Sequence, residues 1–188
     1  MEREIKCAME HLSNVDPIMH LIMEMYQWEC PIGQQSKTIY ELFIGAIIGQ
    51  KIRFFQAKNI RQKLYTHLKE ITPSNLEKTS DQDLQKMGLS TSQISIIRQF
   101  HSHYLLKFPS SSDQLKQFCL ECKQVKGIGD WTVNNVLIMS GLDLDIFLTG
   151  DKFIQRKFDK FYPNQNINNV QLKWAPYRSV AMWFLWRP

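Results

Sequence analysis

Two glycines separated by one residue mark the most informative stretch of the chain, Val125-Lys126-Gly127-Ile128-Gly129-Asp130-Trp131-Thr132. Glycines at this spacing permit a tight hairpin whose backbone amides can approach a phosphate closely, because neither residue carries a side chain. The amides also precede a helical pattern, and the dipole at a helix start favours an anion. Ile128 is predicted to point inward and anchor the turn. The stretch is therefore a candidate docking point for a DNA backbone, unless its glycines serve only the turn.

Helical patterns extend to both sides of this hairpin. Apolar residues recur every three or four positions in segments 39–47, 92–108 and 133–140, which predicts amphipathic helices there. Short helices are also predicted at 81–86, 151–161 and 176–187, and no pair of alternating segments indicates strands. The predicted fold class is all-α, with about ten helices joined by short turns.

Composition restricts the class of protein further. The 188 residues are 44% hydrophobic and 22% charged, which fits one compact body or two small lobes. No apolar run reaches the roughly 18 residues of a membrane span, and the first residues lack a signal-peptide pattern. We expect an intracellular protein with no membrane partner, in the cytoplasm or nucleoid, or in a eukaryotic nucleus. The net charge of +5 is a mild indication of a polyanionic partner.

Blocks of sequence in a fixed order resemble the helix-hairpin-helix DNA glycosylase superfamily, most closely its alkylbase branch, the DNA-3-methyladenine glycosylase II type. The blocks are ELFIGAIIGQ (41–50), LQKMGL (84–89), the hairpin with its following helix (125–140), DIFLTGD (145–151) and APYRS (175–179). The resemblance implies two helical lobes with an active cleft between them. One lobe would comprise residues 36–140 and contain the helix-hairpin-helix, and the second would comprise 1–35 with 141–188.

The resemblance assigns the chemistry to one carboxylate. Asp151 falls where the family keeps its catalytic aspartate, although an aspartate before a helix is usually a plain N-cap, and both roles can hold at once. Such a group can stabilise positive charge developing on the sugar and orient water. Trp131 and Trp186 fall at base-pocket positions of the branch, and Trp183 is a further candidate, since aromatic faces stack on cationic bases. Core packing is the alternative for these tryptophans.

The resemblance also implies how the chain would contact DNA. Gln50 and Lys51 end the first block, and Lys51 stands where the family inserts a side chain into the gap left by a flipped base. Lysine is a poor apolar plug, so Lys51, Ile52 and another loop all remain candidates. Lys126 and Lys152 are assigned to phosphates, with solvated surface lysines as the alternative, and basic residues between 51 and 63 and between 152 and 160 would extend the footprint.

The expected activity is that of a monofunctional glycosylase. Family members that also cut the strand carry a lysine at the position of Trp131, so no AP lyase activity is expected. No cofactor, no side-chain metal site and no iron–sulfur cluster are expected, because the cluster of another branch uses cysteines after the catalytic aspartate. Cys119 and Cys122 lie before it and are expected to be structural or adventitious thiols. The hairpin carbonyls are candidates for a monovalent cation, as in relatives.

The implied function is excision of alkylated purines of the 3-methyladenine type, with hypoxanthine as a second candidate, from damaged double-stranded DNA in base excision repair. A monomer is expected. Two alternatives stay open. One is a catalytically inactive protein that binds DNA damage, and the other is a glycosylase for uracil, mismatched thymine or oxidised purine.

Overall fold

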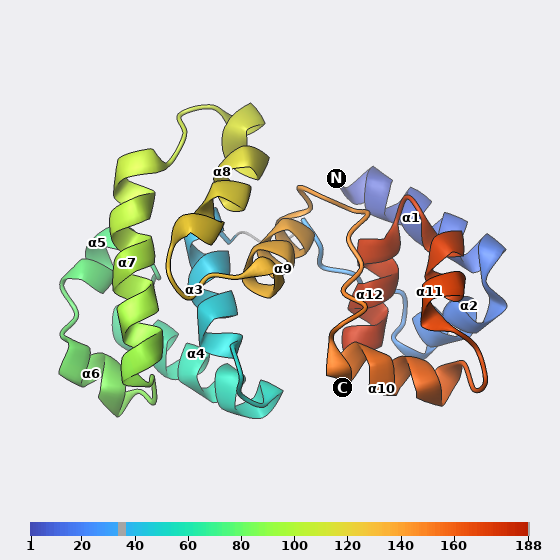
Figure 1. The fold of residues 1–188 in the computed structure, drawn as a ribbon, viewed down its shortest axis with the longest axis horizontal. Helices are drawn as coiled ribbons and strands as arrows, with labels where there is room; N and C mark the ends of the chain where they lie inside the picture. The colour runs from blue at the N-terminus through green and yellow to red at the C-terminus, as the bar shows by residue number, and fades with distance from the viewer. Residues whose placement is uncertain (34–36, 188) are drawn as a thin grey trace. The chain divides into compact units, whose positions relative to one another are not determined.

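The structure is a computed structural model that describes residues 1–33 and 37–187 (Figure 1). Its regular elements are all helices, and none of the described residues forms a strand, which confirms the all-α prediction. The α-helices are α1(Glu2–Val15), α2(Pro17–Met25), α3(Ile39–Gly49), α4(Phe54–Leu68), α5(Pro73–Glu77), α6(Asp81–Lys86), α7(Thr91–Lys107), α8(Leu115–Glu121), α9(Asp130–Ser140), α10(Lys152–Phe161), α11(Ile167–Val170) and α12(Arg178–Trp186). Three short 3-10 turns are η1(Ser112–Gln114), η2(Cys122–Gln124) and η3(Gln171–Trp174).

The chain divides into two compact units. Unit 1 comprises Met1–Gln35 and Ile138–Pro188, and unit 2 comprises Ser36–Leu137. Each unit has its own buried core, so each is described by itself. The cleft expected between the lobes stays a prediction.

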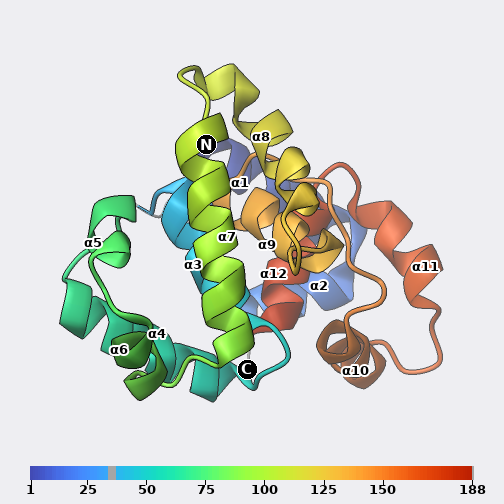
Figure 2. The ribbon, with the colours of Figure 1, turned by 60° about the vertical axis from the view of Figure 1, so that its left-hand side comes forward.

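Unit 2 is built around α3, which packs against α4 and α7 (Figures 1 and 2). The helix begins with a capping box, in which the Thr38 hydroxyl accepts from the Glu41 amide while the Glu41 carboxylate accepts from the Thr38 amide. Its apolar residues are buried on nearly all sides. Gln93 of α7 donates its side-chain amide to the carbonyl of Ile48 at 2.9 Å. The C-terminal end of α3, where the hairpin is held, is therefore fixed to α7.

Unit 1 is built around α12, which packs against α1, α2 and α10 (Figure 1). A buried aspartate joins three of its segments. One oxygen of Asp16 caps α2, and the other accepts from the Tyr162 hydroxyl at 3.0 Å and from the Trp174 indole at 2.8 Å. Burial and the adjacent Asp16 charge raise the pKa of the Tyr162 phenol, so the phenol remains a donor.

The last helix begins later than expected. The sequence predicts a helix from Pro176, whereas α12 begins at Arg178. The amide of Tyr177 donates to the carbonyl of Trp174 at 2.7 Å and closes a turn ahead of the helix. Among the described residues, no helix combines the length and the apolar character that crossing a bilayer requires.

Candidate functional site

The hairpin lies in unit 2 between η2 and α9, and its two glycines differ in what requires them. Gly127 has a φ of +96°, and a Cβ there would lie 2.5 Å from Cγ1 of Ile96 on α7, so only glycine fits. Gly129 has no heavy atom within 4 Å of the place a Cβ would take. Ile128 is 4% exposed and points inward, as the sequence predicts. The packing of the hairpin against α7 therefore explains Gly127. Gly129, by contrast, lies on exposed backbone with open space around it.

Gln50 fastens the end of α3 to the hairpin. Its side-chain amide donates to the carbonyl of Gly127 at 3.0 Å and to the hydroxyl of Thr132 at 2.8 Å. Thr132 is 2% exposed, so its hydroxyl lies inside unit 2 and not on its surface. Gln50 and Thr132 were expected at DNA. The structure gives both side chains a supporting role beneath the hairpin, and direct contact with DNA stays a prediction for them.

Trp131 stands in the first turn of α9 with 36% of its surface exposed. Its ring reaches the last turn of α3, because Cη2 lies 3.7 Å from the place that a Cβ on Gly49 would occupy. The indole thus presents an exposed aromatic surface beside both Gln50 and the hairpin.

Asp151 caps α10 in unit 1. Its Oδ1 accepts from the amides of Phe153 at 2.8 Å and Ile154 at 3.2 Å, so the N-cap role expected from the sequence is present. Its Oδ2 accepts from the indole Nε1–H of Trp186 at 3.4 Å. The carboxylate is half-buried.

The segment 142–150, which leads to Asp151, is bonded to α12. Arg178 forms a two-pronged ion pair with Asp145, with Nε to Oδ1 at 2.7 Å and Nη2 to Oδ2 at 2.8 Å. Ser179 is completely buried, and its hydroxyl accepts from the amide of Ile146 at 2.9 Å. The amide of Leu148 points at the sulfur of Met182 at 3.2 Å. The segment is held by α12 along its length although it has no regular structure.

The two tryptophans of α12 differ in their contacts. Trp186 is half-buried beside Asp151, whereas the indole of Trp183 donates to the carbonyl of Glu29 at 3.1 Å. The guanidinium of Arg187 lies 5.7 Å from the Trp183 ring centre. Within unit 1, Trp186 is therefore the tryptophan placed at the carboxylate.

The basic residues do not all face outward. Lys51, Lys126 and Lys152 are exposed, and Lys51 has a φ of +58°, a strained conformation for a residue with a side chain. Arg61, by contrast, is half-buried and directs its guanidinium toward the carbonyl of Gly45 at 3.4 Å. Burial lowers the pKa of Arg61. Arg61 therefore supports α3, which removes it from the footprint expected between residues 51 and 63.

Phe55 is the surface residue that sequence reasoning missed. It lies in the first turn of α4, four residues after Lys51, and 70% of it is exposed. Ile52, a candidate plug, is only half-exposed. The signal available in the sequence was the pair of phenylalanines directly after the basic turn, where a helix begins.

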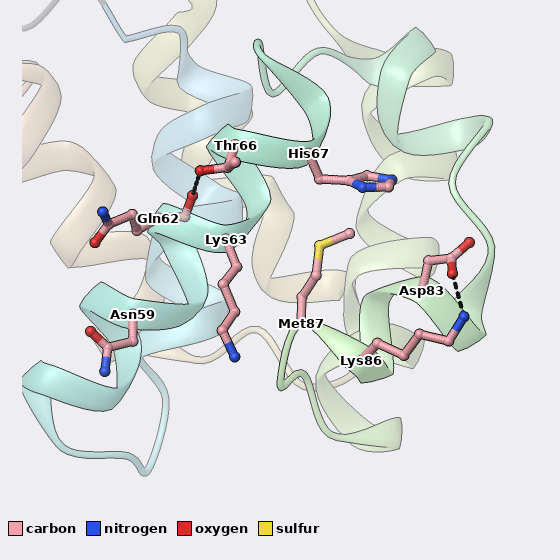
Figure 3. A pocket seen from close by; sticks show the side chains of 8 residues that line it. All are labelled: Asn59, Gln62, Lys63, Thr66, His67, Asp83, Lys86 and Met87. Carbon is pink, nitrogen blue, oxygen red and sulfur yellow. Dashed lines mark hydrogen bonds and ion pairs between the residues drawn. The ribbon is translucent and has the colours of Figure 1, made fainter.

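A cavity of about 730 Å³ also opens on unit 2, between α4 and α6 (Figure 3). Lys86 and Asp83, both on α6, form an ion pair at 2.9 Å, so these two lining charges pair with each other. Of the residues expected to contact DNA, the lining includes only Lys63, which belongs to the basic segment between residues 51 and 63. It consists of Asn59, Gln62, Lys63, Thr66, His67, Asp83, Lys86 and Met87.

Cys119 and Cys122 are core residues. Cys119 and Cys122 are buried, and burial raises the pKa of both thiols, that of Cys119 to about 12. A raised pKa keeps a thiol protonated and unreactive at neutral pH. Across residues 1–33 and 37–187, no group of three or more His, Cys, Asp or Glu side chains is arranged to hold a metal ion.

The fold is that of the helical DNA-3-methyladenine glycosylases. A solved structure of Schizosaccharomyces pombe 3-methyladenine DNA glycosylase (Mag1), in complex with abasic DNA, matches 95% of this chain and 94% of its own, with a TM-score of 0.75 and 21% identity. Two relatives by sequence come from the same yeast and are named as an alkylbase DNA glycosidase-like protein and a DNA-3-methyladenine glycosylase, which confirms the resemblance that the motifs indicate.

Two of these relatives align along most of the chain. Alkylbase DNA glycosidase-like protein mag2 is 21% identical over 99% of this chain and 94% of its own length. DNA-3-methyladenine glycosylase 1 is 22% identical over 94% of this chain and 84% of its own length. No family model matches the chain.

Proposed function

We propose that the chain is a monofunctional DNA glycosylase that hydrolyses the N-glycosidic bond of alkylated purines in double-stranded DNA, in base excision repair. The observation that carries the proposal is the hydrogen bonding of the Asp151 carboxylate. One of its oxygens accepts from two backbone amides at the start of α10, and the other accepts from the indole N–H of Trp186. A carboxylate so held can face positive charge developing on the sugar with little reorganisation.

The substrate class follows from the single acid. A purine alkylated at a ring nitrogen is cationic and leaves readily, so one carboxylate suffices for the hydrolysis. Trp131 and Trp186 have exposed or half-exposed ring surface and would stack on such a base, with Trp183 less directly available. Two of the similar proteins, DNA-3-methyladenine glycosylase 1 and the solved Mag1, are named for 3-methyladenine, which favours the same lesion.

The hairpin would hold the DNA backbone. The exposed amides around Gly129 would bind a phosphate at the start of α9, with Lys126 beside them and Lys152 at the start of α10. The hairpin carbonyls would be the place for a monovalent cation. Lys51 would enter the gap left by the flipped base, and the exposed ring of Phe55 would supply the apolar contact that lysine lacks.

Strand cleavage is excluded from the proposal because Trp131 occupies the position at which an amine would form a Schiff base. The chain would act without a cofactor or cluster, as a monomer. Mag2 carries the word "like" in its name, which keeps the damage-binding alternative as an outcome of the test.

Duplexes with a single alkylated adenine, hypoxanthine, 8-oxoguanine or uracil test the proposal. Each is incubated with the wild type, with Asp151→Asn and with the control Asp159→Asn on the exposed surface of α10. Hot alkali then converts abasic sites to breaks. We expect breaks on the alkylated duplex with the wild type and the control only. Breaks before alkali would contradict the monofunctional assignment, and binding without base release would establish the damage-binding alternative.

A further inference from the structure

One face of α12 follows the segment that leads to Asp151. Arg178, Met182 and Trp186 are spaced four residues apart, so their side chains lie on the same side of the helix. In this order they contact Asp145, Leu148 and Asp151, which follow one another along the chain at intervals of three residues. Each turn of α12 thus holds the next part of the segment, and Trp186 forms the last contact of the series.

The two oxygens of Asp151 have separate donors. Backbone amides of α10 fix Oδ1, and they would do so at any helix start with an aspartate cap. The two capping bonds go to Oδ1 only. The indole N–H of Trp186 defines a direction for Oδ2, with 3.4 Å between the heavy atoms. At that length the bond is weak, so it acts on orientation more than on the stability of unit 1.

We propose that Trp186 is a positioning residue for the catalytic carboxylate, acting through its indole N–H on Oδ2 of Asp151. This role is separate from any stacking of its ring on the base. The inference rests on the proposed function, in which Asp151 stabilises charge on the sugar. It also requires a contact that exists in the free protein, whether or not the protein excises a base.

The contact is tested first without substrate. The indole ¹H–¹⁵N signals of the five tryptophans are recorded by NMR for the wild type and for Asp151→Asn. Asparagine has one acceptor oxygen, so it cannot both cap α10 and accept from Trp186. We expect the Trp186 signal to shift, while the signals of Trp174 and Trp183, which donate to Asp16 and to Glu29, stay in place. An unchanged Trp186 signal would overturn the inference.

The catalytic consequence is tested with Trp186→Phe, which keeps an aromatic ring and removes the N–H. The matched control is Trp28→Phe in the same unit, because Trp28 packs edge-on against His20 and has no part in the proposed site. We expect Trp186→Phe to lower kcat about tenfold with KM within about twofold, and the control to change neither. A rise in KM with kcat unchanged would assign Trp186 to stacking alone and overturn the positioning role.

The proposed function and the positioning role of Trp186 can be refuted separately. If the wild type releases no base from any duplex, the proposed function is wrong, and the NMR shift of Trp186 still decides the contact. If the wild type is active and Trp186→Phe retains its full kcat, the function stands and the positioning role is wrong.

Discussion

Replacing Gln50 by leucine tests how the hairpin is held. The variant loses two hydrogen bonds, to the carbonyl of Gly127 and to the buried hydroxyl of Thr132. A hydrogen bond between neutral groups contributes about 1 kcal/mol net, so we expect a loss of about 2 kcal/mol in the free energy of unfolding. Thr132→Val removes one of the two bonds and should cost about 1 kcal/mol. The matched control, Gln62→Leu on the exposed surface of α4, should stay within about 0.5 kcal/mol of the wild type.

Urea unfolding and DNA binding provide the two measurements. If both side chains act in one network, the double variant of Gln50 and Thr132 should lose about 2 kcal/mol and not the sum of the single losses, about 3. The dissociation constant for an abasic duplex, measured by anisotropy at fixed salt, should rise in the same order as the stability falls. Additive losses in the double variant, or a Gln50 variant that behaves like the Gln62 control, would refute the reasoning.

Three further outcomes are expected. Lys126→Ala should reduce the slope of log affinity against log salt by about 0.9, whereas Lys78→Ala on another exposed surface should leave it unchanged. Ellman's reagent at pH 8 should label one thiol in the native protein, Cys7, and four in denaturant, because burial raises the pKa of the thiols of Cys30, Cys119 and Cys122. The Arg178 guanidinium lowers the pKa of Asp145, so the stability that Asp145→Asn removes should be constant above about pH 4 and vanish as the pH falls further, as followed by thermal unfolding.

Local sequence patterns predicted the helices whose signals are strong. The predicted segments 39–47 and 92–108 fall on α3 and α7, and the inward position of Ile128 follows from its place between two glycines. The turn before α12 was not predictable, since it depends on how the chain closes ahead of Arg178. Local periodicity therefore identifies elements, while contacts between distant segments decide some of their boundaries.

The contacts of the candidate site, like the boundaries of some helices, could not be predicted from local sequence. The position of Asp151 before a helix follows from the sequence, but the indole that donates to its Oδ2, that of Trp186, is 35 residues away and could be found only in the folded chain. The inward turn of Arg61 and the exposure of Phe55 likewise depend on how α4 lies against α3. The order of basic residues in the sequence does not show which guanidinium is buried, because a buried arginine and an exposed arginine are the same letter in the sequence.

Release of free base from alkylated DNA tests the central claim most directly. Duplex DNA methylated with a radioactive reagent is incubated with an excess of the protein, and the released bases are separated by chromatography. The account predicts release of 3-methyladenine by the wild type and by Asp159→Asn, and a loss of at least about a hundredfold with Asp151→Asn. Equal release by the Asp151 variant, or no release by a wild type that still binds the DNA, would contradict it.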